Sequence, residues 1–153
     1  YIQMESNLNA MINKLPKDFR PKENVELHLL DSSIAWFEDS IFYIYSLPDL
    51  DHTLEHAIFQ TNLFKEQYAQ GYNKHSMICY VREARPIKRD VREYYSSPES
   101  TDIITKFAFL IDSPFSRVVA NFFITMQKSP IELKMFNSVK EAEAWCRKKL
   151  KTE

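Results

Sequence analysis

The stretch KFAFLIDSPFSRVVANFFITM, residues 106–126, decides the fold. It contains five consecutive apolar residues, Phe107 to Ile111, and a short apolar run without alternation is typical of a strand buried on both faces. Ser113 is a favourable helix N-cap, and Pro114 suits the first helical position, where a missing N–H costs nothing. Apolar residues at helical spacing follow: Phe115, Val118, Val119, Phe122, Phe123 and Met126. The stretch therefore predicts a buried strand that leads directly into a packed helix.

The length and composition of the chain predict one globular domain with a substantial core. A chain of 153 residues that is 44% hydrophobic and 14% aromatic is unlike a disordered segment. The formal net charge of −1 gives no overall reason to expect binding to nucleic acid or to an acidic membrane surface. The only glycine is Gly71, so the glycine-rich loops that bind nucleotide phosphates are excluded. We expect no cofactor.

The two cysteines indicate the compartment. Cys79 and Cys146 both lie within apolar patterns, which favours reduced core thiols of a cytoplasmic protein over a disulfide or a zinc site. No stretch approaches the roughly 20 apolar residues of a membrane span. The first residues also lack a charged start followed by an apolar segment, so we expect no signal peptide.

The rest of the chain predicts the order β-β-β-α-β-α-β-α-β-α behind a short extension. Residues 1–22 are predicted to be an N-terminal helical extension of one or two turns, which Pro16 and Pro21 end. Residues 23–153 are predicted to form the α/β domain. Its N-terminal strands should pair antiparallel, and its C-terminal βα units should form a parallel, helix-covered half of one mixed sheet.

Local patterns place the elements of this domain. Aromatic and β-branched residues between 25 and 45 predict antiparallel strands with a tight turn at Glu38-Asp39. A helix from Pro48 to a cap at Gly71 follows, and Met77 to Val81 is a second buried strand. Residues 138–141 match a capping box at the start of the last helix. The predicted buried stripe of the long helix is Leu50, Leu54, Ala57, Ile58, Thr61, Phe64 and Tyr68.

The run IDSPFSRVVANFFITMQKSPIELKMFNSVKEAEAW, residues 111–145, resembles a group of small bacterial proteins related to STAS domains, which have the anti-sigma-factor-antagonist or SpoIIAA-like fold. The group is largely uncharacterised, so the resemblance implies a fold more than a function. It extends from about residue 26 to residue 150. The matching residues are Ser113, Pro114, Ser116, Arg117, Asn121, Phe122, Phe123, Pro130, Phe136, Ala142 and Trp145.

One departure from the resemblance bears on function. STAS regulators of the sigma-factor type carry a phosphorylated serine after the second buried strand, at the start of a short helix. The corresponding segment here is residues 85–89, RPIKR, with Lys88 near the switch position. A lysine cannot accept the phosphate, so the resemblance implies that this phosphorylation switch is absent.

Residues 52–56, HTLEH, match the H-x-x-E-H pattern of inverted zinc peptidases. In that chemistry His52 and His56 would hold one metal ion, and Glu55 would activate a water molecule. Helical spacing places both histidines opposite the buried stripe, so we expect them to be solvent-exposed. A catalytic zinc ion also needs a third ligand, so a metal-dependent hydrolase is the remote alternative and we expect no metal site.

Phe59 and Leu63 lie on the same outer face of the predicted helix. Such an apolar pair is either harmless or covered by another surface. The covering surface would be the N-terminal segment or a second subunit, and a symmetric homodimer is the commonest form of the latter. Phe59 and Leu63 are therefore the candidate interface residues.

A second candidate site is an anion site near the Ser113 helix start. Its free N–H groups and the positive end of the helix dipole would lie at the carboxyl edge of the sheet, beside the basic segment after Val81. The alternative is that this segment forms surface ion pairs and Ser113 is only a cap. The candidate ligand residues are Ser113, Ser116, Arg117, Asn121, Arg85, Lys88 and Arg89.

These observations leave a ranked set of functions. The first is a non-catalytic cytoplasmic module that regulates or scaffolds by binding a protein partner, with a homodimer as one form. The second is a domain that binds a small anionic or lipid-like ligand near Ser113 and Arg117. A nucleic-acid role has little support, because the basic segment is short. No nucleophile motif is present, so we expect no enzymatic activity.

Overall fold

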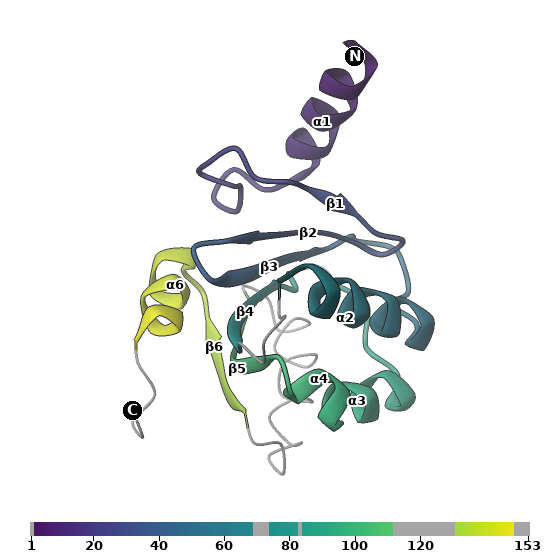
Figure 1. Ribbon diagram of the computed structural model, residues 1–153, viewed down its shortest axis with the longest axis vertical. Helices are drawn as coiled ribbons and strands as arrows, with labels where there is room; N and C mark the ends of the chain where they lie inside the picture. Colours follow the sequence, from purple (N-terminus) through teal and green to yellow (C-terminus); the bar gives the residue numbers. More distant parts are fainter. Residues whose placement is uncertain (1, 69–73, 83, 112–130, 149–153) are drawn as a thin grey trace.

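The computed structural model describes residues 2–68, with side chains from residue 8 onward, and residues 74–82, 84–111 and 131–148. Six strands form one mixed sheet in the order β1-β2-β3-β4-β5-β6 (Figure 1). The strands are β1 (His28–Leu29), β2 (Ser33–Glu38), β3 (Ile41–Ser46), β4 (His75–Tyr80), β5 (Ile104–Leu110) and β6 (Glu132–Phe136). The helices are α1 (Ile2–Lys14), α2 (Leu54–Tyr68), α3 (Arg89–Tyr95), α4 (Pro98–Thr101) and α6 (Val139–Arg147).

The pairing within the sheet confirms the predicted mixed topology. β1, β2 and β3 pair antiparallel, whereas β3, β4, β5 and β6 pair parallel. The connection between β2 and β3 is a two-residue turn in which Asp39 has φ 55° and Ser40 has φ 61°. Such left-handed turns match the twist of a hairpin, and aspartate tolerates them. The turn lies one residue later than predicted, because Glu38 still belongs to β2.

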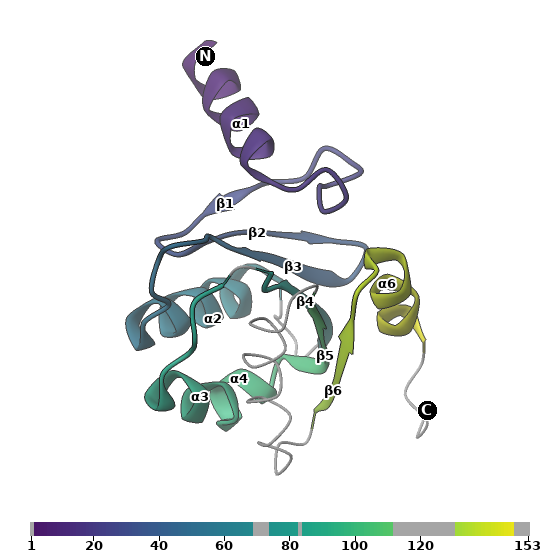
Figure 2. The same ribbon diagram turned by 180° about the vertical axis from the view of Figure 1, so that it is seen from behind.

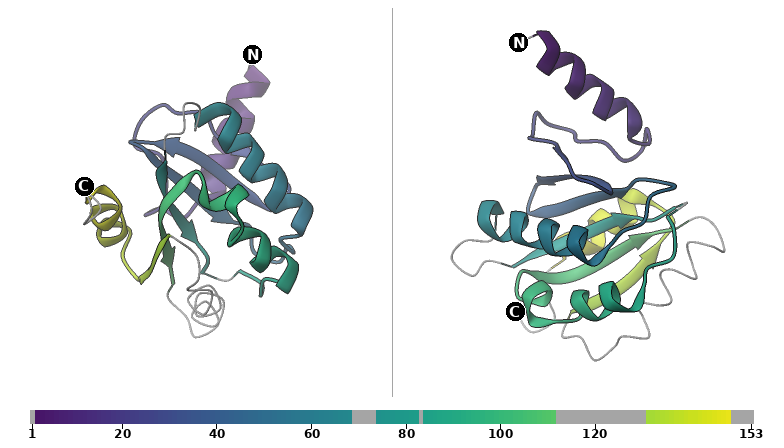
Figure 3. Two further views of the ribbon diagram at one scale, coloured as in Figure 1. Left: turned by 60° about the horizontal axis from the view of Figure 1, so that its bottom comes forward. Right: turned by 90° about the vertical axis from the view of Figure 1, so that its right-hand side faces the viewer.

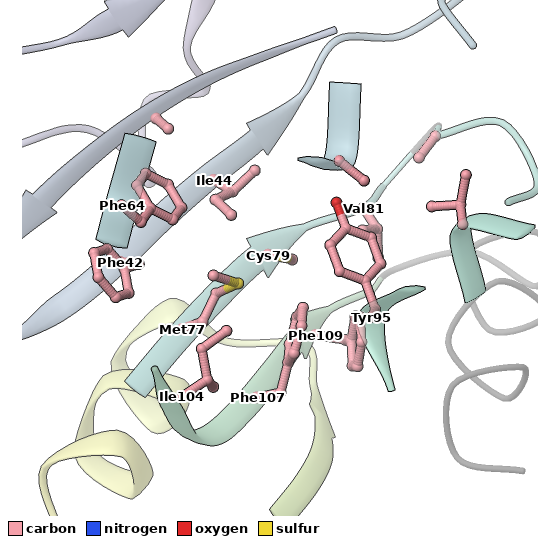
Figure 4. Packing of buried hydrophobic residues seen from close by; sticks show 14 of the residues in the cluster. Phe42, Ile44, Phe64, Met77, Cys79, Val81, Tyr95, Ile104, Phe107 and Phe109 are labelled. Carbon is pink, nitrogen blue, oxygen red and sulfur yellow. The ribbon is translucent and has the colours of Figure 1, made fainter. Parts of the chain in front are cut away.

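Alternating side chains of the sheet build two cores on its two faces. On one face, Phe42, Met77 and Phe107 pack beneath α2, α3 and α4, and Figure 4 shows part of this cluster. On the other face, Tyr43 and Ile78 belong to a second cluster with residues of α6. In β5, the phenylalanines face the first core and Ala108 and Leu110 face the second, which confirms the predicted burial on both faces. Figure 2 shows, from behind, the sheet with helices on both of its faces.

The N-terminal segment packs on the second core. α1 ends at Lys14, two residues before Pro16, and is longer than the predicted one or two turns. It extends away from the sheet beyond β1 (Figure 3). The chain after it returns to the sheet, where Phe19 is buried with its ring 5.1 Å from Trp36 and 5.6 Å from Tyr43. The segment therefore contributes to the core opposite α2.

The predicted start of the long helix is wrong. α2 begins at Leu54, because Asp49 adopts a left-handed φ of 65° and the chain stays non-helical up to Thr53. Leu50 therefore lies outside the helix and is 46% exposed, and Ile58 is also exposed. The buried positions of α2 are Ala57, Gln60, Thr61 and Phe64. The stripe is shifted from the predicted one and includes a polar residue, Gln60.

Some predicted features can be compared with the structure only in part. At α6, Ser138 Oγ accepts the N–H of Glu141 at 3.4 Å, which confirms the serine half of the predicted capping box. The predicted helix after Pro114 and the predicted cap at Gly71 lie outside the described residues.

Candidate ligand pocket

A cavity of about 40 Å³ lies at the carboxyl ends of β3, β4 and β5, between the sheet and helices α2 and α3. That volume holds roughly three water-sized groups. Its apolar wall includes side chains from all three strands, Ile44, Cys79, Phe107 and Phe109, and Val81, which directly follows β4. Figure 4 shows these residues with the Tyr95 ring of α3 beside them. The carboxyl edge of parallel strands is where open α/β sheets place their ligands.

Five of the polar side chains that line the same cavity are linked by hydrogen bonds. Ser32 Oγ lies 2.7 Å from His52 Nδ1, and His52 Nε2 is bonded to the Tyr95 hydroxyl. Ser33 donates to Gln60 Oε1 at 3.1 Å, and Gln60 also hydrogen-bonds the Tyr95 side chain. The His52 and Tyr95 rings stack with an interplanar angle of 9°. We call the cavity with these five residues, Ser32, Ser33, His52, Gln60 and Tyr95, the neutral pocket.

The titratable groups of the neutral pocket are uncharged near pH 7. Burial, and after it the nearby charge of His56, lowers the pKa of His52 to about 4. Burial raises the pKa of Tyr95 well above its usual value and also raises the pKa of the Cys79 thiol. Arg85 lies at the lining, and its guanidinium is paired with Asp51 at 3.2 Å. The pocket therefore presents neutral donors and acceptors on an apolar wall.

The expected exposure of His52 is wrong, because it is not part of the helix. Thr53 precedes α2, and its Oγ1 accepts the N–H of His56 at 3.3 Å. His56 Nδ1 accepts the N–H of Thr53 in return at 3.2 Å. His56 thus takes the part that Glu or Gln plays in a capping box, while His52 points into the cavity. The H-x-x-E-H residues have separate structural roles.

These contacts weaken the metal-site alternative. Both ring nitrogens of His52 are already hydrogen-bonded, and the two imidazole centroids are 6.1 Å apart. Glu55 is exposed at the start of α2. Within the part of the chain that the structure describes, no group of three or more His, Cys, Asp or Glu side chains is placed to hold a metal ion.

The predicted anion residues fall into two sets. Ser113, Ser116, Arg117 and Asn121 lie outside the described residues. Lys88 is the N-cap residue of α3, the helix that follows β4, and its side chain makes no capping hydrogen bond. Three arginines of this segment bind carboxylates, in the pairs Arg82–Asp18 at 3.4 Å, Arg85–Asp51 at 3.2 Å and Arg89–Glu93 at 2.9 Å.

The predicted interface residues lie on the outer side of α2. Phe59 is 63% exposed, its neighbour Ile58 is exposed, and Leu63 is half-buried. We call these three residues the α2 patch. The N-terminal segment packs on the opposite face of the sheet, so it does not cover Phe59.

The residues of the neutral pocket come from distant parts of the sequence, and most were missed. Ser32 lies between β1 and β2, Ser33 is the first residue of β2, and Tyr95 is separated from His52 by 43 positions. Gln60 carried the only local signal, because it is a polar residue at a helical spacing from the apolar positions Ala57 and Phe64.

The strand order and the two helical layers define a SpoIIAA-like fold. The structure is similar to the crystal structure of an uncharacterized protein of the DUF3478 family with a SpoIIAA-like fold from Shewanella loihica PV-4. The TM-score is 0.52 at 12% sequence identity, and the match covers 80% of this chain and 91% of that chain. The predicted resemblance is thereby confirmed at the level of the fold.

The family follows from the sequence match. Residues 35–150 match the family model for a domain of unknown function, DUF7793, and the chain belongs to that family. None of the curated proteins compared with the chain matches it. Among the described helices, none has both the length and the apolar character that crossing a membrane requires.

Proposed function

We propose that this protein is a non-catalytic cytoplasmic regulatory module that binds a small, uncharged, largely apolar molecule in the neutral pocket. The observation that carries the proposal is the convergence of the five hydrogen-bonded, neutral polar side chains on an apolar cavity at the carboxyl edge of the parallel strands. Ligand sites of this kind combine apolar walls with a few polar groups that fix orientation. The ligand would form hydrogen bonds with the side chain of His52 or Tyr95.

The chemistry of the pocket residues supports binding over catalysis. A cysteine nucleophile needs a thiolate, whereas burial raises the pKa of Cys79. A histidine general base works best with a pKa near the working pH, whereas the pKa of His52 is lowered to about 4. Charged ligands are disfavoured too, because Arg85, the charged residue at the lining, is already paired with Asp51.

The test compares two ligands of matched shape, isobutanol and isobutyrate, by NMR titration of the amides of Cys79 and Val81. We expect saturable shifts with the neutral alcohol and none with the anion, because desolvating a carboxylate in an apolar cavity is costly. Ser46→Leu, a half-buried lining position, should block the response. Asn62→Leu, on the exposed side of α2, should leave it unchanged. Equal responses to both ligands, or none to either, would refute the proposal.

A second candidate function is protein interaction through the α2 patch, and the 63% exposure of Phe59 favours it. Large exposed apolar side chains that adjoin one another are typical of interaction sites. We propose a second copy of the chain as the partner. Sedimentation equilibrium should then show a dimer that Phe59→Ser dissociates and that Lys140→Ser, at an exposed position of α6, leaves intact. A monomer at every concentration would exclude this homodimer.

A further inference from the structure

A second hollow, of about 370 Å³, lies at the opposite edge of the sheet from the neutral pocket. It is bounded by the starts of β3, β4 and β5 and by the end of α6. Four cationic side chains line it, Lys74, Lys106, Arg147 and Lys148, against the single carboxylate of Asp39. We call this hollow the basic pocket.

Lys106 is the buried member of the basic pocket. It is 3% exposed, and its Nζ donates to the carbonyl oxygens of Trp145 at 2.9 Å and Lys148 at 2.5 Å. These bonds cap the end of α6, since a cation suits a helix C-terminus. They use two of the three N–H groups of the ammonium. No carboxylate of the described residues pairs with it, although buried charges are normally paired.

Two lysines at the rim of the basic pocket carry positive charge that is not paired within the described residues. Lys74 and Lys148 are exposed, and their ammonium groups make no hydrogen bond or ion pair within the described part of the chain. Arg147 binds Asp39 at 3.0 Å and approaches Glu143 at 3.9 Å. In contrast to these lysines, three arginines of the segment after β4 are each paired with a carboxylate. Three lysines without a carboxylate partner in the described part of the chain, Lys74, Lys106 and Lys148, thus lie together at the amino edge of the sheet.

We propose that the basic pocket binds a compact multivalent oxyanion of the phosphate type. Two negative oxygens would face Lys74 and Lys148 at the rim, and a third would approach the buried ammonium of Lys106, which lacks a counter-charge. Lysine suits this task, because its ammonium is a point charge that binds phosphate without a fixed planar geometry. The site is independent of the neutral pocket, since the two have no lining residue in common.

The probe is inorganic pyrophosphate, titrated calorimetrically into the full chain at roughly 0.01 M ionic strength, where the Debye length is about 30 Å. We expect one saturable site whose affinity falls as salt is added. Lys74→Ala with Lys148→Ala should weaken binding about tenfold or more, which corresponds to about 1.4 kcal/mol. Both side chains are exposed, so this variant should fold normally.

The matched control is Lys14→Ala with Lys17→Ala, which removes the same charge from exposed positions of the N-terminal segment. It should bind pyrophosphate as the unaltered protein does. Lys106→Met keeps the length of the stem and should abolish the rise in Tm that pyrophosphate produces. Absence of saturable binding at low salt, or equal loss in the control, would overturn the proposal. Either result leaves the isobutanol test of the neutral pocket unaffected.

Discussion

His52 shows how contacts decide the role of a residue. By spacing alone, His52 and His56 form a pair on one helix face, and that pairing predicted exposure or a metal. In the structure His52 bonds Ser32 and Tyr95, whereas His56 caps α2 through Thr53. The two histidines therefore have different roles, one in the neutral pocket and one at the start of α2.

The lowered pKa of His52 predicts a specific dependence of stability on pH. The unfolded chain binds a proton at a pKa near 6.5, whereas folded His52 does so only at about 4. The contribution of the neutral imidazole is complete above pH 6.5 and is lost as the pH falls toward 4. Between pH 7.5 and 4.5 the free energy of unfolding should decrease by about 2 kcal/mol through this group.

Denaturant unfolding of the unaltered protein and of His52→Gln at the two pH values isolates that contribution. The variant should lose less stability on acidification, because glutamine does not titrate. His28→Gln, at a histidine outside the neutral pocket, is the control, and it should not remove the pH dependence that His52 contributes. An identical pH dependence in His52→Gln and the unaltered protein would show that His52 is not buried in its neutral form.

At the scale of elements, the start of α2 gives a second prediction. Thr53 and His56 satisfy each other's N–H groups, so Thr53→Ala should lower the free energy of unfolding by about 1 kcal/mol. Thermal and denaturant unfolding measure this directly. Thr53→Ser retains the hydroxyl and should recover most of the loss. A Thr53→Ala protein as stable as the unaltered one would contradict the capping role.

The success of sequence-based prediction at this scale depended on the range of the interactions. The β5 strand and the α6 cap follow from local patterns, and the structure confirms both. The start of α2 was misplaced because the left-handed Asp49 gives no clear local signal. The neutral pocket was missed because Ser32, His52 and Tyr95 meet only through the pairing of the strands and the packing of α2 and α3.

At the scale of the whole molecule, the two edges of the sheet differ in chemistry. The carboxyl edge has a small apolar cavity with neutral polar groups, and the amino edge has a larger hollow lined by cations. Both follow from one architecture, because β3, β4 and β5 run parallel and bring their starts together at one edge and their ends at the other. The fold thus offers separate places for a neutral ligand and an anion.

Ligand binding in the neutral pocket can be tested by a crystal structure of the protein soaked with 2-bromoethanol, measured at the bromine absorption edge. We expect anomalous density inside the neutral pocket, with the hydroxyl within hydrogen-bonding distance of His52 or Tyr95. Ser46→Leu crystals should lack that density. Bromine density confined to the α2 patch or to other surface positions, with an empty neutral pocket, would show that the pocket does not bind a small neutral ligand.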